Sequence, residues 1–250
     1  MIPGPDYIYE CPNCGKLLKE GSFASGNTFN ARHFSDGSCN APMLPDFPVL
    51  TKCKACDTIL NLNTLKEIGT FDYDYHYDYK KGEVVNRNNR IRWKNILENF
   101  LKISIKIEDI PRADFLKRED LFCALEVFPQ HELYIRREIW WSYHKRLKSE
   151  FSRNKNISEI TKQACLLLIE DNALYKENCR ALIRLLNPKD EQQRIMIAEL
   201  YRNLGEFDKC VELMDILSDI RYSGLKRMFK EECKKRNPLT FCINFDALKE

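Results

Sequence analysis

Four cysteines in two short motifs are the residues of this chain most clearly suited to chemistry. Cys11 and Cys14 are separated by two residues, and Cys53 and Cys56 repeat that spacing 42 positions later. A Cys-x-x-Cys turn aims two sulfurs at one point, so two such turns can supply the four thiolates of a tetrahedral zinc site. Because four protein ligands fill the coordination sphere, the pattern predicts one structural Zn²⁺ rather than a catalytic metal.

Two other uses of cysteine fit the pattern less well. A disulfide framework needs an oxidising compartment, and a redox Cys-x-x-Cys is expected singly, at the start of a helix after a strand. Here there are two motifs, and each precedes a short apolar pair, Leu17-Leu18 or Ile59-Leu60. Cys39 and His33 lie between the motifs, but no second ligand stands at the required spacing from either. We therefore interpret them as an ordinary thiol and a surface imidazole.

The composition is typical of a folded protein that does not cross a membrane. Of its 250 residues, 44 % are apolar and 31 % charged, with no run of eighteen apolar residues. The first residues lack the basic and apolar regions of a signal peptide, so a cytoplasmic location is expected. In that compartment the six cysteines beyond residue 100 are best interpreted as small core residues. The net charge is only +3, which by itself points to no partner.

Short strands are the elements expected to position the four cysteines. Residues 6–10, 47–52 and 58–62 border the motifs and are apolar enough to form antiparallel hairpins, which predicts a zinc ribbon over residues 1–69. The loop between the motifs, residues 21–48, is rich in Gly, Ser, Asn and Pro, which favour turns. Its Ser25–Thr28 segment could hold an anion or a peptide carbonyl. A loop held in place by the metal is the favoured interpretation.

Residues 70–110 are predicted to link the two halves. Aromatic residues alternate with polar ones from 71 to 79, which indicates a strand or an extended linker, and a helix is expected from about residue 92 to 101. The alternating polar positions resemble a metal cluster in type: Asp72, Asp74, His76 and Asp78. On a strand such side chains stand about 7 Å apart, so a solvated polar face is the better interpretation.

From residue 112 the apolar residues follow the period of a helix, and residues 111–250 are predicted to form a helical domain. Asn187-Pro188 and Gly205 mark breaks between helices. Short connections imply antiparallel helical hairpins stacked in sequence. The expected helices cover residues 115–128, 133–147, 157–170, 173–187, 190–203, 207–218 and 222–236.

One of these hairpins resembles the tetratricopeptide repeat over about one 34-residue unit. The positions that carry the resemblance are Ala198, Tyr201, Leu204, Gly205, Phe207 and Cys210. The resemblance implies that Ala198 and Cys210 face each other where the two helices approach most closely. In the preceding unit Asp171 replaces the glycine and Lys176 the second small residue, so that unit departs from the pattern. The expected fold class is α+β, a four-cysteine zinc ribbon followed by a mainly α, tetratricopeptide-like domain.

The chain as a whole also resembles a group of uncharacterised bacterial cytosolic zinc-ribbon proteins. The shared features are the Cys11–Gly15 motif, the Ser25–Thr28 loop, prolines 42, 45 and 48, the Cys53–Cys56 motif and Trp140-Trp141. The resemblance implies zinc binding and this architecture, and it implies no activity.

Three functions compete. The first is a cytoplasmic interaction or adaptor protein that binds a protein or peptide, with Trp140, Trp141 and Tyr143 as candidate contacts, since adjacent tryptophans on a helix cannot both enter one core stripe. The second is nucleic-acid binding through Arg87, Arg90, Arg92 and Lys94 around Trp93. Against it, residues 1–69 carry six basic and seven acidic residues, where a ribbon on a phosphate backbone should be basic. The third is an enzyme, which is disfavoured because no nucleophile motif or phosphate loop occurs.

Overall fold

The chain forms two compact units in the computed structural model, which describes residues 2–73, 75–78, 83–86, 90–95, 102, 104–153, 157–217 and 220–244. The first, called here the cysteine unit, comprises residues 1–29 and 41–120. The second, called the helical unit, comprises residues 30–40 and 121–250. Residues 30–40, which lie between the two cysteine motifs, therefore fold with the helices. The predicted domain limits at residues 69 and 110 do not include this exchange.

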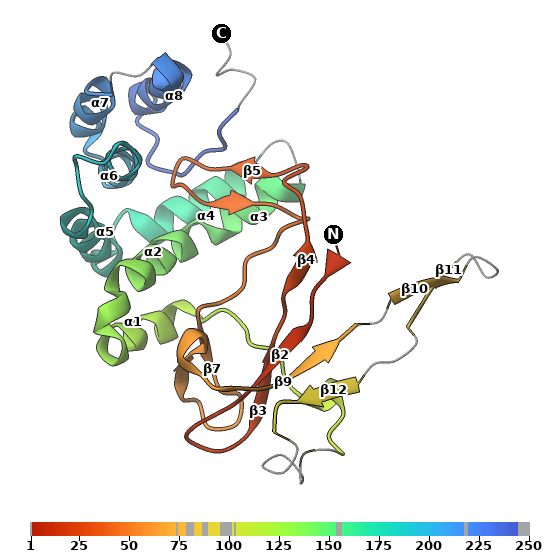
Figure 1. Cartoon of the computed structure of the whole chain (residues 1–250). Helices are drawn as coiled ribbons and strands as arrows, with labels where there is room; N and C mark the ends of the chain where they lie inside the picture. The colour runs from red at the N-terminus through yellow and green to blue at the C-terminus, as the bar shows by residue number, and fades with distance from the viewer. Residues whose placement is uncertain are drawn as a thin grey trace. The chain divides into compact units, whose positions relative to one another are not determined.

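A four-stranded antiparallel sheet supports the cysteine unit (Figure 1). Its strands run in the order β12 (Arg90–Trp93), β9 (Glu67–Asp72), β2 (Asp6–Glu10) and β3 (Leu17–Glu20). Ile8 of β2 packs with Ile68 and Phe71 of β9, and with Ile107 and Ile110 near the short helix η3 (Ile107–Asp109). The edge strand β3 is bonded further to the segment after η3, because Lys19 donates to Pro111 and accepts from Ala113.

Three two-stranded antiparallel sheets complete the described strands of the cysteine unit. They pair β1 (Ile2–Pro3) with β4 (Phe23–Ser25), β7 (Leu50–Lys52) with β8 (Ile59–Asn61), and β10 (Tyr75–Asp78) with β11 (Glu83–Asn86). The extended conformation predicted from the aromatic alternation is thus present in β9 and β10. The helix expected from residue 92 is wrong at its start, because Trp93 pairs with Gly69 in β12. Glycine suits this position, since a Cβ on Gly69 would stand 3.2 Å from the Trp93 ring. Residues 96–101 lie outside the described part of the chain.

The helical unit follows the predicted helices closely, and the α+β class is confirmed. Side-chain caps start three helices: Ser158, Asn172 and Asp190 each accept a hydrogen bond from the amide three residues later. The predicted helix over 133–147 is two helices, interrupted at His144. None of the described helices is long and apolar enough to cross a membrane. Their bounds are α1 (Arg118–Val127), α2 (Glu132–Tyr143), α3 (Lys145–Arg153), α4 (Glu159–Ile169), α5 (Ala173–Leu185), α6 (Glu191–Asn203), α7 (Phe207–Asp215) and α8 (Ser223–Lys234).

The hairpin of α6 and α7 has the core that its sequence indicates. Ala198 and Cys210 are completely buried in one apolar cluster, and Tyr201 and Phe207 pack against that cluster. Gly205 lies between the helices with φ at +78°, a conformation that glycine adopts at little cost. The small side chains therefore lie at the contact between the two helices. A helical hairpin of this kind is compatible with several repeat families, so the repeat type stays a prediction.

A hairpin from the N-terminal half is built into the helical unit. It consists of β5 (Arg32–His33) and β6 (Cys39–Asn40) and lies beside α3 and α4 in Figure 1. Phe34 is buried and its ring stands edge-on to Phe151, 6.1 Å between centroids. The C-terminal segment pairs with the same hairpin, because the Ser35 amide donates to the Phe241 carbonyl and the Ile243 amide to the His33 carbonyl.

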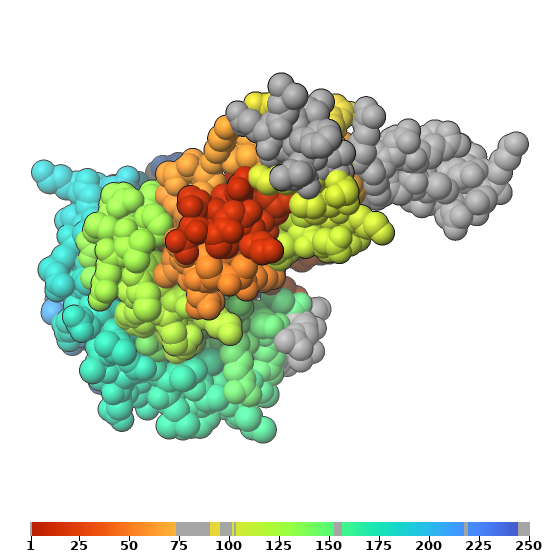
Figure 2. Space-filling model, turned by 90° about the horizontal axis from the view of Figure 1, so that it is seen from below, coloured from red at the N-terminus to blue at the C-terminus, as the bar shows by residue number. Residues whose placement is uncertain are grey.

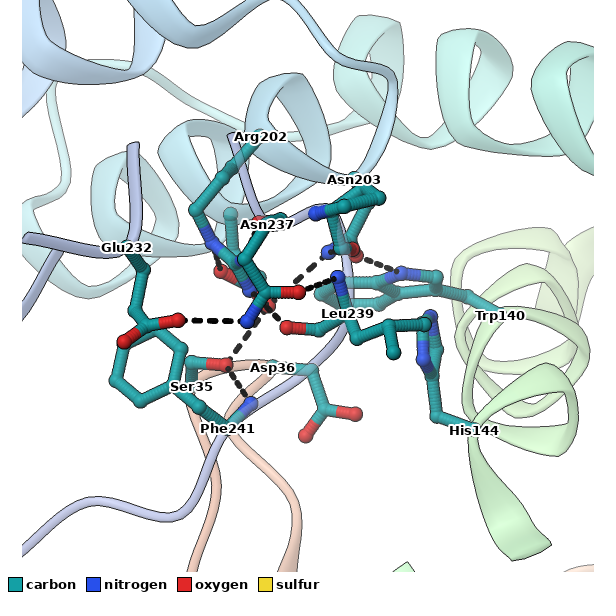
Figure 3. Close-up of polar contacts among 12 residues, drawn as sticks. Ser35, Asp36, Trp140, His144, Arg202, Asn203, Glu232, Asn237, Leu239 and Phe241 are labelled. Carbon is teal, nitrogen blue, oxygen red and sulfur yellow. Dashed lines mark hydrogen bonds and ion pairs between the residues drawn. The ribbon is translucent and has the colours of Figure 1, made fainter. Parts of the chain in front are cut away.

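Buried polar groups join this hairpin, the helices and the C-terminal segment (Figure 3). The Ser35 hydroxyl donates to Glu199 over 2.7 Å, and Arg202 binds the same carboxylate through two nitrogens, at 2.6 and 2.8 Å. Arg202 also donates to the Leu239 carbonyl. Asp36 pairs with Lys148 at 2.6 Å. Because almost every member is completely buried, each depends on its partners for the hydrogen bonds that water would otherwise supply.

His144 lies next to this network and should make the helical unit sensitive to acid. Its Nε2 is 3.1 Å from the Tyr175 hydroxyl, and its Nδ1 has no hydrogen-bond partner among the described residues. Burial lowers the pKa of His144 to about 3, although Asp36 favours the protonated ring. The unfolded chain, with an ordinary histidine, binds a proton below about pH 6.5 that the folded unit excludes.

We expect the stability of the helical unit to fall as the pH drops below that of free histidine. From about pH 7 to pH 5, the wild type should lose roughly 2 kcal/mol more than the His144→Gln variant, which cannot take up this proton. Urea unfolding of both proteins at the two pH values measures the difference. Equal losses in the two proteins would show that His144 titrates alike in the folded and unfolded states.

Candidate metal centre

The four predicted cysteines converge on one point. The sulfurs of Cys11, Cys14, Cys53 and Cys56 all lie within 4.8 Å of one another. Cys11 Sγ is 3.7 Å from Cys56 Sγ, and Cys14 Sγ is 3.7 Å from Cys53 Sγ. Sulfurs bound tetrahedrally to zinc at about 2.3 Å are separated by roughly 3.7 Å, so the cluster has the dimensions of such a site. The predicted convergence of the four cysteines into one cluster with the dimensions of a single metal site is confirmed.

Two equivalent hairpins place these sulfurs. In the first, Glu10 of β2 pairs with Leu17 of β3; in the second, Lys52 of β7 pairs with Ile59 of β8. The turn of each hairpin is closed by the same two backbone bonds, 42 positions apart. Cys11 donates to Lys16 as Cys53 donates to Thr58, and Gly15 donates to Cys11 as Asp57 donates to Cys53. The repeat seen in the sequence is therefore a repeat of backbone geometry.

Each turn requires one residue with positive φ, just after its second cysteine. Gly15 fills this position in the first turn with φ at +71°, and Asp57 fills the equivalent position in the second with φ at +59°. Glycine adopts this conformation freely, and aspartate is among the few other residues that tolerate it. Beneath the turns, an apolar cluster that includes Tyr9, Leu18 and Leu60 packs against Cys11 and Cys53. Local conformation and a small core together position the ligands.

Two polar side chains form an outer layer that the motif alone does not reveal. The Asn13 amide donates to the Thr58 hydroxyl at 3.0 Å, which links the two turns, and that hydroxyl is 3.2 Å from Cys56 Sγ. Hydrogen bonds from Thr58 and Asn13 lower the pKa of Cys56 to about 5. In the sequence, the one signal for this role of Asn13 and Thr58 is their position next to the cysteines, because residues beside metal ligands commonly orient those ligands.

The electrostatics of the cluster favour a cation. The Lys16 amide favours the Cys14 thiolate, but partial desolvation and the sulfurs of Cys56 and Cys53 outweigh it and raise the pKa of Cys14 to about 12. Burial raises the pKa of Cys11. Four thiolates cannot ionise together in this space unless a positive charge compensates them. A divalent ion held by all four sulfurs would supply that charge, and these residues fit it.

The other residues that the sequence analysis considered and disfavoured as ligands do not belong to this cluster where they are described. Cys39 and His33 pair across β5 and β6 in the helical unit, with Cys39 Sγ 3.9 Å from His33 Nε2. Asp74 lies outside the described residues, and of the neighbouring predicted cluster only the backbone of His76 and Asp78 is described. Among the remaining cysteines, four are buried core residues as predicted: Cys165, Cys179, Cys210 and Cys233. Cys123 is exposed, contrary to that interpretation.

The candidate partner-binding aromatic residues are largely inside the helical unit. Trp140 is completely buried, and its indole nitrogen donates to Asn203 at 2.8 Å; Tyr143 is 2 % exposed. Trp141 is half-buried, donates to the Asp36 carbonyl at 3.0 Å and has Arg137 over its ring at 4.7 Å. The two tryptophans therefore point in different directions, Trp140 toward Asn203 and Trp141 toward Asp36, as their angular separation on the helix requires. Buried in this way, Trp140 and Tyr143 present no surface to a partner.

The residues suggested for nucleic-acid contact do not form an unpaired basic surface where they are described. Arg87 lies outside the described residues, and of Arg90 only the backbone in β12 is described. Arg92 Nε is 2.8 Å from Asp72 Oδ2, and Lys94 Nζ is 2.8 Å from Glu67 Oε2. Both described cations therefore have a carboxylate partner, and residues 1–69, with six basic and seven acidic residues, carry none of the excess positive charge expected of a ribbon on a phosphate backbone.

Fold and site together define a four-cysteine metal-binding protein with a separate helical unit. Comparison with known proteins finds no matching family model, no similar curated protein and no similar solved structure. Function must therefore be argued from the residues of this chain.

Proposed function

We propose that this chain is a zinc-binding, cytoplasmic interaction protein without catalytic activity, in which the metal is structural. The observation that carries the proposal is the closed four-sulfur cluster. Four thiolates at tetrahedral spacing favour Zn²⁺ over oxygen-preferring ions such as Mg²⁺ and Ca²⁺. With all four positions filled by protein, such an ion has none left for a substrate or an activated water.

An apolar face on the helical unit supports the interaction role. Helix α4 buries Thr161, Cys165 and Ile169, while Ile160 and Leu167 are 76 % and 71 % exposed. Positions 160 and 167 are seven residues apart and so lie on the same side of the helix, away from the buried stripe. Two further apolar side chains of α4 lie on this side and are at least partly exposed: Ala164 and Leu168. Clusters of this kind commonly contact other proteins.

This face replaces the aromatic residues suggested by the sequence as the proposed contact. A partner with an amphipathic helix or an apolar peptide would complement it, because α4 offers an apolar stripe with charged neighbours such as Lys162 and Glu159. Nucleic-acid binding has less support, because residues 1–69 carry no excess positive charge and Arg92 and Lys94 each have a carboxylate partner.

The two parts of the proposal are tested separately. Elemental analysis of natively purified protein should find about one zinc per chain, as a closed four-cysteine site requires. Affinity capture should then compare the wild type with Leu167→Glu and with Gln192→Glu, which adds the same charge at an exposed site on α6. A partner retained by Gln192→Glu and lost by Leu167→Glu supports the α4 face. If all three proteins captured the same partners, the proposed role of the α4 face would be wrong. If the natively purified protein contained no zinc, the proposed structural metal would be wrong.

A further inference from the structure

A cavity of about 480 Å³ opens in the cysteine unit beside the metal centre. Three segments line it: residues 15–18 after the first cysteine motif, residues 52–55 in the second, and residues from Lys102 to Ala113. In Figure 2 the N-terminal segment, in red, reaches the surface and borders the orange and yellow-green segments. The volume of the cavity lies within the range of about 300–1,000 Å³ that is typical of small-molecule sites. We call it the knuckle cavity.

Apolar side chains form much of the wall of the knuckle cavity. Hydrogen bonds made by Lys19, which is not itself a lining residue, hold part of the wall in place. Lys19 Nζ donates to the Ile107 carbonyl at 2.7 Å, and the backbone of Lys19 pairs with residues 111 and 113. The cavity is therefore lined by anchored segments. Its apolar lining residues are Leu17, Leu18, Ala55, Ile105, Ile110, Pro111 and Ala113.

Most of the charged groups that line the same cavity are positive. Its lining contains Lys16, Lys52, Lys54, Lys102 and Arg112, against Asp109 and, in the zinc-bound protein, the thiolate of Cys53. Four of the cations have acidic partners that are not lining residues: Lys52 with Asp120 and Asp57, Lys54 with Asp114, Lys102 with Glu10, and Arg112 with Asp6. The cations therefore line the cavity, and the acids that balance most of their charge do not.

These ion pairs leave the cations able to accept an anion. Lys54 and Asp114 are 52 % and 68 % exposed in their side chains, so this pair contributes only about 0–1 kcal/mol and can rearrange at small cost. The partner of Arg112, Asp6, is 2 % exposed, so that pair stays formed and Arg112 can offer an anion only its remaining donors. Each lysine also has three donors and each arginine five, so one carboxylate partner does not exhaust them. Lys16 is exposed as well.

We propose that the knuckle cavity binds a small organic anion that has an apolar body, such as an aromatic or aliphatic carboxylate. The apolar wall would take the body of the ligand, and the lysines at the rim would hold its charge. An inorganic anion would leave the wall uncovered, and a neutral apolar molecule would leave the cations unused. This site is distinct from the α4 face and goes beyond the proposed interaction role.

Anilinonaphthalene sulfonate is a suitable probe, because it joins one negative charge to a two-ring aromatic body and fluoresces when its surroundings are apolar. Phenylnaphthylamine, its uncharged analogue, is the matched ligand control. The zinc-loaded full chain should bind the sulfonate at least about tenfold more tightly than the amine, because ion pairing adds to the same apolar contact. Higher salt should reduce only the binding of the sulfonate.

Charge reversal localises the site. The double variant Lys16→Glu and Lys54→Glu changes two exposed cations of the rim, and Lys189→Glu with Lys234→Glu makes the same change in the helical unit. The first should weaken sulfonate binding at least about fivefold with little effect on the amine, and the second should change neither. Zinc content of every variant is measured, and a variant that has lost zinc is replaced by the single change Lys16→Glu. Equal affinity for the two probes, or equal binding of the sulfonate by both variants, would overturn the proposal.

Discussion

The Cys53→Ser variant should lose the folded structure of the cysteine unit while the helical unit stays folded. A serine hydroxyl is a poor zinc ligand, and structural zinc contributes on the order of 10–16 kcal/mol of apparent binding free energy in small zinc-binding peptides. The cluster beneath the metal has five buried apolar residues besides Cys11 and Cys53, and the second cluster of the unit, around Ile8 and Phe71, has five more, so these small cores cannot offset such a loss. The helices have separate cores, such as the cluster around Ala198 and Phe229.

Hydrogen exchange measured along the chain is the decisive readout. Amides of β2, β3, β7 and β8 should exchange rapidly in the variant, whereas those of α5 to α7 should remain protected. The hairpin of β5 and β6 gives the sharpest contrast, because it lies between the two cysteine motifs in sequence yet folds with the helices. Its amides should stay protected. Cys39→Ser, which removes an exposed thiol outside the site, is the matched control and should leave the pattern unchanged. Loss of protection in α5 to α7 would show that the units fold as one.

Arg202→Met should destabilise the helical unit by about 3–5 kcal/mol, the cost of removing one partner of a buried ion pair. Arg202 and Glu199 both have side chains that are 0 % exposed. Methionine fills much of the volume of arginine but leaves the Glu199 carboxylate with only the bonds from Ser35 and Asn203. It also removes the donors to the Leu239 and Asn237 carbonyls. The variant therefore leaves a buried charge and two carbonyl acceptors without adequate partners.

The pH dependence of this variant has a definite sign. Burial raises the pKa of Glu199, and Arg202 is the largest influence that lowers it. Without Arg202 that pKa must rise further, so the folded variant holds a proton that the unfolded chain releases above about pH 4.3. When the pKa of a carboxyl group is higher in the folded than in the unfolded state, the stability of the folded protein falls as the pH increases. The destabilisation should therefore be smallest near pH 4 and largest near neutral pH, as measured by urea unfolding.

A double-mutant cycle separates the charge from the packing. Glu199→Gln combined with Arg202→Met removes both charges, so it should recover part of the stability that Arg202→Met loses at neutral pH. Arg184→Met, which removes an exposed arginine from the last turn of α5, should change stability by about 0.5 kcal/mol or less. Simple additivity of the Glu199 and Arg202 changes would show that the two side chains do not interact.

The parts of this structure that sequence could predict depend on neighbours in the chain. Each cysteine motif is a turn of six residues, and the spacing of its cysteines and its glycine or aspartate is visible directly. The helix limits are equally local, because Asn172 and Asp190 cap the helices that follow them. For Ala198 and Cys210, small size about two helical turns before Gly205 and a little over one turn after it is sufficient.

The parts that escaped prediction depend on distant partners. Trp140 is buried because Asn203, 63 positions later, accepts its indole hydrogen bond. Ser35 and Asp36 look like ordinary turn residues, and nothing near them indicates that Ser35 will bind Glu199, 164 positions away. The knuckle cavity likewise combines three segments separated by tens of residues. Periodicity and motif spacing contain no information on such pairings.

The interleaving of the two units has a consequence for the order of folding during synthesis. The hairpin of β5 and β6 leaves the ribosome early, yet its partner Phe241 follows Ser35 by 206 positions. Contacts of such long sequence separation form late, because the chain entropy of closing the loop must be overcome first. The cysteine unit, by contrast, has its second motif complete by residue 56 and can bind metal while the helices are still being made. The hairpin of β5 and β6, joined at both ends to the cysteine unit, therefore completes its contacts only after residues 241–243 have been synthesised.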